Sequence, residues 1–421
     1  MIARSPALLL LALALALGAP AAAQPPELST SAAAAPAPSY SGPALIPAPA
    51  GDPASFQESF KGRAMLIAAA KAAIRYLKTL PPNKALDVAG RRYAPAALID
   101  SARAMIAIAR AAKSPDDLDR RVRAAFDVFE SAGSDGKGRV VFSSYYEPVL
   151  DARLKRTRVY RYPLYRRPPD MVEVDLSAFG VKADSGGVVL GRVGPDRRVT
   201  PYYTRSDIDR RRALAGRGLE IAWLKNPLDA MDLQVQGSGI LRLRGGREVM
   251  VAYAGTNDRP FSSAGMTLVR TGVFRRDQIT YAKLRDYLRR NPDAASWILA
   301  QNPRYTFFDL SPLPPGGEPY GAAGRPLVAA RSIAVDPSVV PLGALVFFTT
   351  TSPLADRDGR LLGSFPSARF AFALDTGGAI KGAGRVDIYA GHGPQAVTTA
   401  RNQWAPGRLY VLVKKLPARA R

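Results

Sequence analysis

Apolar residues recur at helical spacing in the stretch that ends at Pro81-Pro82. Similar patterns follow over residues 95–112 and 115–131. Ser114 precedes the last of them and is a favourable N-cap residue. We therefore predict three helices in the N-terminal third of the chain.

From Gly138 onward the pattern changes to short runs of β-branched and aromatic residues, separated by glycine and proline. Such runs predict strands, interrupted here by one helix over residues 280–300. The predicted strands cover residues 159–162, 232–235, 241–243, 249–253, 327–335, 344–349, 369–374, 386–389 and 409–413. Short strands with glycine-rich corners favour barrels over a parallel sheet, so the predicted fold is mainly β with N-terminal helices.

The N-terminus has the composition of a secretory signal. Arg4 precedes an apolar run over residues 7–17, and three alanines end at Ala23, so residues 1–23 are predicted to be a cleaved signal peptide. The run is shorter than the roughly 20 apolar residues that a spanning helix needs. Residues 24–53 are mostly Pro, Ala and Ser, which predicts a disordered tether. We expect an exported, periplasmic protein with no transmembrane segment.

The composition restricts the possible chemistry. The 421 residues include no cysteine and one histidine, His392. This excludes disulfides, thiolate metal sites, a cysteine nucleophile, a lipoprotein cysteine and multi-histidine metal centres. We therefore expect no metal and no cofactor, which leaves acid–base chemistry by carboxylates, or binding without chemistry.

The chain is strongly basic, with 59 Lys and Arg against 35 Asp and Glu and a formal net charge of +24. The basic residues are scattered along the sequence, and no nucleic-acid-binding motif accompanies them, so we predict no nucleic-acid partner. A solvated surface with diffuse attraction to a polyanion explains this charge.

The segment with the clearest catalytic pattern contains two aspartates. A predicted strand delivers Asp375 into a glycine-rich turn that includes Lys381, and a second strand then carries Asp387. Carboxylates at adjacent strand ends raise each other's pKa, so one could act as an acid near neutral pH, although Lys381 would oppose this. The alternative is that both aspartates accept hydrogen bonds from turn amides. A third acid, Asp336, precedes a proline and alone would be an ordinary turn residue.

Five segments in order carry a resemblance to a known family. Asp336, Asp375 and Asp387 form a three-aspartate pattern. The other four segments are S-S-Y-Y-E-P (143–148), V-Q-G-S-G (235–239), Y-A-G-T-N (253–257) and N-P-R-Y-T-F-F (302–308). They resemble the T-G-Y-Y-x-P, V-Q-G-S-G, Y-A-G-x-N and N-P-x-x-x-F-F motifs of the membrane-bound lytic murein transglycosylase A (MltA) family, and the C-terminal hundred residues resemble its 3D domain.

The resemblance covers residues 55–415 and implies a two-domain architecture. The first domain would be a double-psi β-barrel made of residues 54–150 and 319–415, with 319–415 as the 3D domain. A second β-barrel, residues 151–318, would be inserted into it. The groove between the two domains would hold a glycan strand of peptidoglycan.

The same resemblance implies an activity and residue roles. The family cleaves peptidoglycan between N-acetylmuramic acid and N-acetylglucosamine without water, as a carbon–oxygen lyase, and leaves a 1,6-anhydro sugar. Asp387 matches its catalytic aspartate, which acts first as acid and then as base, and Asp375 and Asp336 match the two supporting acids. The expected substrate-binding residues are Ser143, Tyr145, Tyr146, Gln236, Ser238 and Lys381. Glycan strands and other cell-wall enzymes are the expected partners of a monomer.

Several of these residues have a simpler interpretation. The Ser143 hydroxyl could bond nearby backbone, and Tyr145 and Tyr146 could pack as barrel wall. Glu147 is expected to be structural. Ser144 replaces the family glycine, and serine would strain the turn if that position requires a positive φ. No role is expected for His392, and the basic charge with the tether could hold the protein against an acidic wall.

Two other functions stay open. One is a wall-binding or wall-loosening protein without catalysis, because the fold alone does not fix the function. The other is a glycoside hydrolase in which Asp387 works with Asp375 or Glu147 as the second carboxylate.

Overall fold

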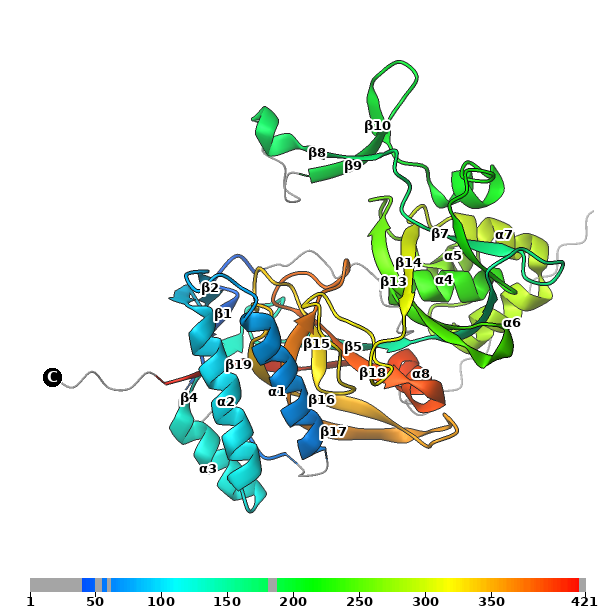
Figure 1. Cartoon of the computed structure of the whole chain (residues 1–421). Coiled ribbons are helices and arrows are strands. Elements are labelled where there is room, and N and C mark those ends of the chain that lie inside the picture. The colour runs from blue at the N-terminus through cyan, green and yellow to red at the C-terminus, as the bar shows by residue number, and fades with distance from the viewer. Residues whose placement is uncertain (1–39, 50–54, 59–61, 181–187, 416–421) are drawn as a thin grey trace, which may run out of the picture.

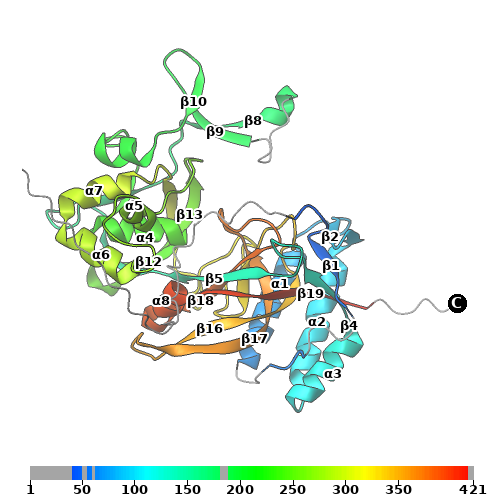
Figure 2. The same cartoon turned by 180° about the vertical axis from the view of Figure 1, so that it is seen from behind.

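The computed structural model describes residues 40–49, 55–58, 62–180 and 188–415, which form two domains (Figures 1 and 2). The predicted signal peptide and residues 24–39 and 50–53 of the predicted tether lie outside the described residues. None of the described helices combines the length and the apolar composition needed to cross a bilayer.

The first domain is built on a closed barrel of six strands. They are β5 (Val140–Glu147), β15 (Ser332–Ala334), β16 (Leu345–Ala355), β17 (Leu361–Asp375), β18 (Arg385–His392) and β19 (Trp404–Lys414). The pairing order is β5-β18-β15-β17-β16-β19, and β19 pairs back to β5. Two of the pairs, β18–β5 and β15–β17, are parallel. Closure removes the free edges of these strands, and it confirms a barrel in this domain.

Two short strands extend this sheet beyond β19. They are β1 (Leu45–Pro47) and β4 (Phe126–Ser131). β1 falls within the predicted tether, so that prediction is wrong for residues 45–47: Leu45 is buried in the core, and the strand pairs with β4. The predicted helix 115–131 also ends early, because residues 126–130 pair with β19 and bury Phe126 and Phe129.

Three helices cover one side of the barrel, as predicted (Figure 1). They are α1 (Arg63–Leu77), α2 (Pro95–Ala111) and α3 (Pro115–Ala125). Ser114 caps α3 by accepting a hydrogen bond from the Asp117 amide. Strand alternation divides the apolar side chains of β16 between two cores: Phe347 packs in the cluster under α1 and α2, and Phe348 packs with Phe142 in the other.

The inserted domain carries a six-stranded sheet in the order β14-β13-β12-β6-β11-β7. These strands are β6 (Val149–Arg153), β7 (Tyr162–Tyr165), β11 (Glu220–Leu224), β12 (Gly239–Arg242), β13 (Glu248–Thr256) and β14 (Thr306–Pro312). Among the described residues no ladder joins β7 to β14, although these two edge strands lie near each other. The second barrel that the resemblance implies for this domain stays a prediction. A separate sheet of β8 (Met171–Asp175), β9 (Val188–Val193) and β10 (Val199–Pro201) projects from the insert (Figure 2).

The insert is more helical than its sequence predicted. Its helices are α4 (Pro227–Gln236), α5 (Ala264–Arg270), α6 (Tyr281–Arg290) and α7 (Pro292–Ala300). The predicted strand 232–235 lies inside α4, whose start is fixed by the Asn226 cap and by Pro227 at its first position. The predicted helix 280–300 is two helices, because Pro292 has no amide hydrogen with which to continue α6.

Other strand predictions fail at their boundaries. Of the predicted strand 159–162, only Tyr162 belongs to a strand, and of 327–335 only residues 332–334 do. Outside the two large sheets, β2 (Leu86–Val88) pairs with β3 (Arg91–Tyr93). The insert also has three short helical turns, η1 (Leu176–Phe179), η2 (Ser206–Arg210) and η3 (Arg244–Gly246), and the first domain has α8 (Gly393–Asn402), a helix that was not predicted. α8 lies beside β5 and β18, on the side of the barrel that faces the insert (Figures 1 and 2).

A buried ion pair ties the segment before α1 to the barrel. Arg331 is 1% exposed and Glu58 is 8% exposed, and their side chains form a salt bridge. Each also bonds the backbone of Phe370 in β17: Arg331 donates to its carbonyl at 2.8 Å, and Glu58 accepts from its amide at 2.8 Å. The pair therefore holds this segment and the start of β15 against one residue of β17.

Removing one partner should be costly. We expect Arg331→Met to lower the free energy of unfolding by about 3 kcal/mol, because the Glu58 carboxylate is left buried without a counter-charge. The double variant Glu58→Gln/Arg331→Met should lose less than Arg331→Met alone. Urea unfolding followed by circular dichroism measures both values, and a loss below about 1 kcal/mol for Arg331→Met would contradict a structural role for the pair.

Candidate active site

The parallel pairing of β18 with β5 places Asp387 directly opposite Ser143. The Ser143 hydroxyl donates a hydrogen bond of 2.6 Å to Oδ1 of Asp387. Asp387 is 5% exposed and Ser143 is fully buried. The serine thus holds the Asp387 carboxyl in one orientation, inside a site with little water around it.

Asp375 ends β17 and lies on the same side of the site. The Tyr145 hydroxyl donates to its Oδ2 at 2.6 Å, and the amides of Ala322 and Thr376 donate to its Oδ1 at 2.8 and 2.9 Å. Ser143 and Tyr145 are alternate residues of β5, so both side chains point to one face of the strand. That alternation brings Asp387 and Asp375 together.

Burial makes Asp387 and Asp375 weaker acids than exposed aspartates, because it raises the pKa of both. It raises the pKa of Asp387 to about 6, against the opposing effects of the Arg385 charge and of the Ser143 hydrogen bond, and the neighbouring Asp375 raises this pKa further. Burial also raises the pKa of Asp375, although the bonds from Tyr145, Ala322 and Thr376 oppose it. Asp387 can therefore hold or release a proton near neutral pH, as a group that acts as both acid and base must.

Asp336 has the opposite environment. Partial burial raises its pKa, but hydrogen bonds from the Gly382 amide at 2.7 Å and from the Ser338 hydroxyl at 2.7 Å, together with the Lys381 charge, hold that pKa below its usual value. Asp336 therefore stays ionised and anchors the glycine-rich turn between β17 and β18. Lys381 is exposed on that turn, and its charge acts on Asp336.

Glu147 continues the catalytic face of β5 toward the insert. It is 2% exposed, its Oε2 accepts a 2.8 Å hydrogen bond from the Ser238 hydroxyl, and its Oε1 has no partner among the described residues. Burial raises the pKa of Glu147 to about 8, against the Ser238 bond, and Glu318 and Asp375 add to the rise. This carboxyl is therefore neutral at pH 7.

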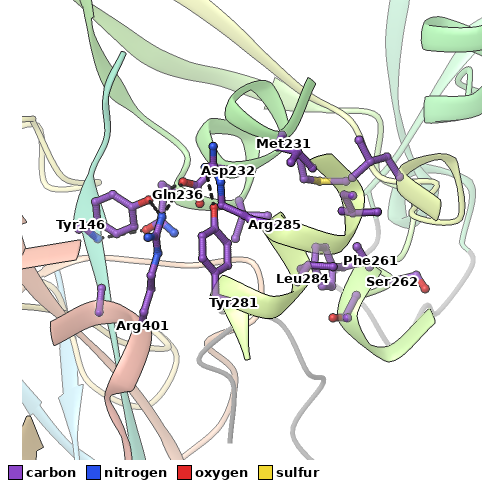
Figure 3. Close-up of a pocket in the computed structure, with 18 of the residues that line it drawn as sticks. Tyr146, Met231, Asp232, Gln236, Phe261, Ser262, Tyr281, Leu284, Arg285 and Arg401 are labelled. Atoms are coloured by element: carbon purple, nitrogen blue, oxygen red, sulfur yellow. Dashed lines mark hydrogen bonds and ion pairs between the residues drawn. The ribbon is translucent and has the colours of Figure 1, made fainter. Parts of the chain in front are cut away.

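Two other predicted substrate-binding residues meet away from Asp387: Tyr146, on the opposite face of β5, and Gln236, at the end of α4. Gln236 Oε1 accepts a 3.1 Å bond from the Tyr146 amide, and the Tyr146 hydroxyl donates to Asp232. Arg401 of α8 donates to that hydroxyl at 3.1 Å and lies over the Tyr281 ring (Figure 3). The structure therefore joins Ser143, Tyr145, Asp375 and Asp387 in one cluster, and it places Tyr146 and Gln236 in a contact between the domains.

That contact borders a pocket between α8, β5 and the helices of the insert (Figure 3). Its lining includes the apolar side chains of Met231, Phe261 and Leu284. Tyr146 and Ser144 reach it from β5, whose other face carries Ser143 and Tyr145. The pocket is thus separated from Asp387 by the strand itself.

Ser144 and His392, the two unusual positions noted in the sequence, lie in ordinary surroundings. Ser144 does not take a positive φ; it lies in β5, and its hydroxyl donates to the Ile388 carbonyl at 2.6 Å, so the expected strain does not arise. His392 is exposed at the end of β18, with Nδ1 3.8 Å from a carboxylate oxygen of Glu318. Among the residues that the structure describes, no cluster of acidic or histidine side chains could hold a metal ion.

Sequence reasoning missed three side chains of the site. Arg385 and Tyr389 flank Asp387 at two-residue spacing on β18, and the Tyr389 hydroxyl donates to Glu318 at 2.6 Å. Trp404 pairs with Ser143 across the β19–β5 ladder and is half-buried. The period-two alternation of a strand would have indicated Arg385 and Tyr389 once Asp387 was chosen. Trp404 could be assigned to the site only from the pairing of β19 with β5.

The raised pKa of Asp387 predicts a pH-dependent cost in stability. The folded protein binds this proton more tightly than the unfolded chain. Ionisation of Asp387 therefore lowers the free energy of unfolding as the pH rises from about 4 through 6. We expect Asp387→Asn to be more stable than the natural chain by about 2 to 3 kcal/mol above pH 7, and to show little of this gain at pH 4. Denaturant unfolding of both proteins across this range measures the difference. A difference that does not change with pH would contradict a raised pKa.

Comparison with known proteins gives one consistent result. Residues 141–309 match the family described as the MltA specific insert domain, and residues 331–413 match the 3D domain. The chain is 31% identical over 283 residues to "Membrane-bound lytic murein transglycosylase A" of Vibrio cholerae, covering 66% of this chain and 67% of that protein.

Solved structures agree with these matches. A membrane-bound lytic murein transglycosylase from Agrobacterium tumefaciens superposes with a TM-score of 0.67 at 26% identity, covering 88% of this chain and 98% of the other. E. coli MltA with bound chitohexaose superposes with a TM-score of 0.61 at 26% identity, covering 83% and 90% of the two chains.

Proposed function

This chain belongs to the membrane-bound lytic murein transglycosylase A family, and we propose that it cleaves peptidoglycan between N-acetylmuramic acid and N-acetylglucosamine without water. The observation that carries the proposal is the buried Asp387 carboxyl, oriented by Ser143, with a pKa of about 6. The E. coli relative binds chitohexaose, a glycan oligomer, which supports a glycan strand as the ligand here.

In the first step Asp387 is the acid. Its proton passes to the oxygen that bridges the two sugars, the C1–O bond of N-acetylmuramic acid breaks, and the Asp387 carboxylate remains. Burial makes the proton available near neutral pH, where an exposed aspartate would already be ionised.

In the second step Asp387 is the base. Its carboxylate takes the proton of the 6-hydroxyl of the same N-acetylmuramic acid while that oxygen bonds to C1. The proton lost in the first step is regained, and the product is a 1,6-anhydro sugar. Because the nucleophile is already part of the substrate, the step is unimolecular, which removes the entropic cost of bringing in a second reactant.

The neighbouring residues support these two steps. Asp375 is fixed by Tyr145 and by two amides, and its charge resists ionisation of Asp387. Asp336 holds the turn that links Asp375 to Asp387. We propose that Tyr145 contacts sugar and that Ser238 and Lys381 do so at the borders of the site. Ser143, which is fully buried, would orient Asp387 instead of binding sugar, and Tyr146 and Gln236 would hold the insert in register with β5. The two parallel pairs of the closed barrel favour a double-psi topology.

The products of digestion test the proposal directly. With peptidoglycan as substrate and the full mature chain as enzyme, we expect mass spectrometry to show muropeptides one water lighter than hydrolysis products. Asp387→Ala should yield none, because it removes the carboxyl that is proposed to protonate the bridging oxygen. Wall binding with no products from either protein would instead favour a binding module.

The same assay separates the hydrolase alternative. A hydrolase would release free reducing ends and would need Glu147 or Asp375 as an ionised second carboxylate. Glu147 is neutral at pH 7, so Glu147→Gln, which replaces a neutral acid by a neutral amide, should keep the anhydro product. Reducing ends that disappear in Glu147→Gln would establish the hydrolase.

We also propose that the enzyme works in the periplasm, attached to the acidic wall by its positive charge. The formal net charge of +24 and the absence of a lipid-accepting cysteine support electrostatic attachment. Binding to isolated walls should therefore weaken strongly between about 0.01 M and about 1 M salt, because the screening length falls from about 30 Å to about 3 Å over this range. Sedimentation with purified walls measures it, and binding that does not respond to salt would contradict this attachment.

A further inference from the structure

Arg385 is a buried cation without a hydrogen-bond partner. It is 2% exposed, and none of its three guanidinium nitrogens bonds to any of the residues that the structure describes. Among the described residues two other arginines are buried, Arg205 and Arg331, and both form hydrogen bonds and ion pairs. Because an unpaired buried cation is expensive, its position needs a reason.

The position of Arg385 relates it to the catalytic carboxyl. It lies two residues before Asp387 on β18, so both side chains point to the same face of the strand. Its guanidinium lies 4.3 Å from the centre of the Trp404 ring, and Trp404 pairs with Ser143, the residue that bonds Asp387. The negative face of the ring accommodates the cation without a hydrogen bond and leaves its charge free to act on the site.

The other groups around Asp387 are neutral or acidic. β5 contributes the hydroxyls of Ser143 and Tyr145, and β17 contributes the carboxyl of Asp375. β15 faces Asp387 with the backbone of Ala334. Among the described groups that influence the pKa of Asp387, Arg385 is the positively charged one. Its charge lowers the Asp387 pKa, whereas burial raises it.

We propose that Arg385 is a positioning residue of the transglycosylase reaction, whose fixed charge stabilises the Asp387 carboxylate between proton donation and proton return. The inference rests on the function proposed above. It assigns Arg385 no contact with substrate, because the side chain is buried and its guanidinium is stacked on Trp404.

The charge matters because Asp387 must change protonation state twice. When the proton moves to the bridging oxygen, a carboxylate appears in a site of low polarity, next to the carboxyl of Asp375. Arg385 is already charged and already desolvated, so it favours that carboxylate without reorganisation at the moment of reaction. When the 6-hydroxyl returns the proton, the original state is restored, and Arg385 exchanges no proton in either step.

Removing the charge of Arg385 should raise the pKa of Asp387. In Arg385→Met, which keeps an unbranched stem and removes the charge, we expect the Asp387 pKa to rise by about one unit. The alkaline limb of kcat/KM for anhydro-muropeptide release should rise by the same amount, and kcat should fall about tenfold, because proton donation becomes harder. Arg385→Lys should restore most of the natural pH profile.

A second buried arginine supplies the control. Arg331→Met removes a buried cation that is paired with Glu58, so it should lower stability and leave the pH profile of the active fraction unchanged. If Arg385→Met shows only this behaviour, with the natural pH profile, the proposal is wrong and Arg385 is structural. If Arg385→Met does not fold, Arg385→Gln and Arg385→Lys form the neutral and charged pair in its place.

A substrate-free measurement separates this proposal from the proposed function. Carbon-13 NMR of aspartate-labelled protein, with the Asp387 signal assigned by its absence in Asp387→Asn, reports the carboxyl pKa directly. A higher pKa in Arg385→Met than in the natural chain supports the counter-charge even if no anhydro product is ever found. An unchanged Asp387 pKa overturns it, even in a fully active transglycosylase.

Discussion

The site depends on one constraint, the parallel pairing of β18 with β5. Their register puts Asp387 opposite Ser143, and the alternation of β5 then aims Tyr145 at Asp375. A slip of one residue would send all of these side chains to the other face of the strand. Barrel closure prevents such a slip, because β5 is held on its other side by β19 and β18 is held by β15. The fold thus fixes the geometry of the candidate site through the backbone hydrogen bonds of the strand ladders.

The same barrel gives chemically identical side chains different acidities. Asp387 is buried with one neutral donor, so its pKa rises, whereas Asp336 collects amide and hydroxyl donors and the Lys381 charge, so its pKa falls. The first can exchange a proton near neutral pH, and the second serves as a permanent anion that shapes a turn. Among the three aspartates of the pattern, the surroundings of the carboxyl therefore decide whether it can exchange a proton near neutral pH or stays ionised and holds a turn in place.

The sequence predicted secondary structure correctly where a residue's neighbours along the chain decide its conformation. The Ser114 cap, the helices α1 and α2, and the strands around Asp387 and Phe347 were all predictable for that reason. Residues 126–131 and 232–235 were assigned wrongly, because pairing with β19 and the Asn226–Pro227 helix start overrode their propensities. The strand order of the insert sheet likewise depends on pairings between distant strands.

The candidate site shows the same division. The motifs indicated the three aspartates and Ser143, and the structure joins Ser143 to Asp387. The positions of Tyr146 and Gln236 at the domain contact, the neutral state of Glu147, and the contact between Arg385 and Trp404 all require knowing which strands are neighbours. Pairing brings those residues together across gaps in sequence that no local pattern spans.

The central claim is that Asp387 cleaves the glycan with the substrate's own hydroxyl in place of water. Digestion of peptidoglycan in water enriched in oxygen-18 tests this claim most directly, because hydrolysis must place a solvent oxygen on C1 of N-acetylmuramic acid. We predict products without the heavy isotope, formed only when Asp387 is present. Incorporation of one oxygen-18 atom at C1 would contradict the account and make the protein a hydrolase.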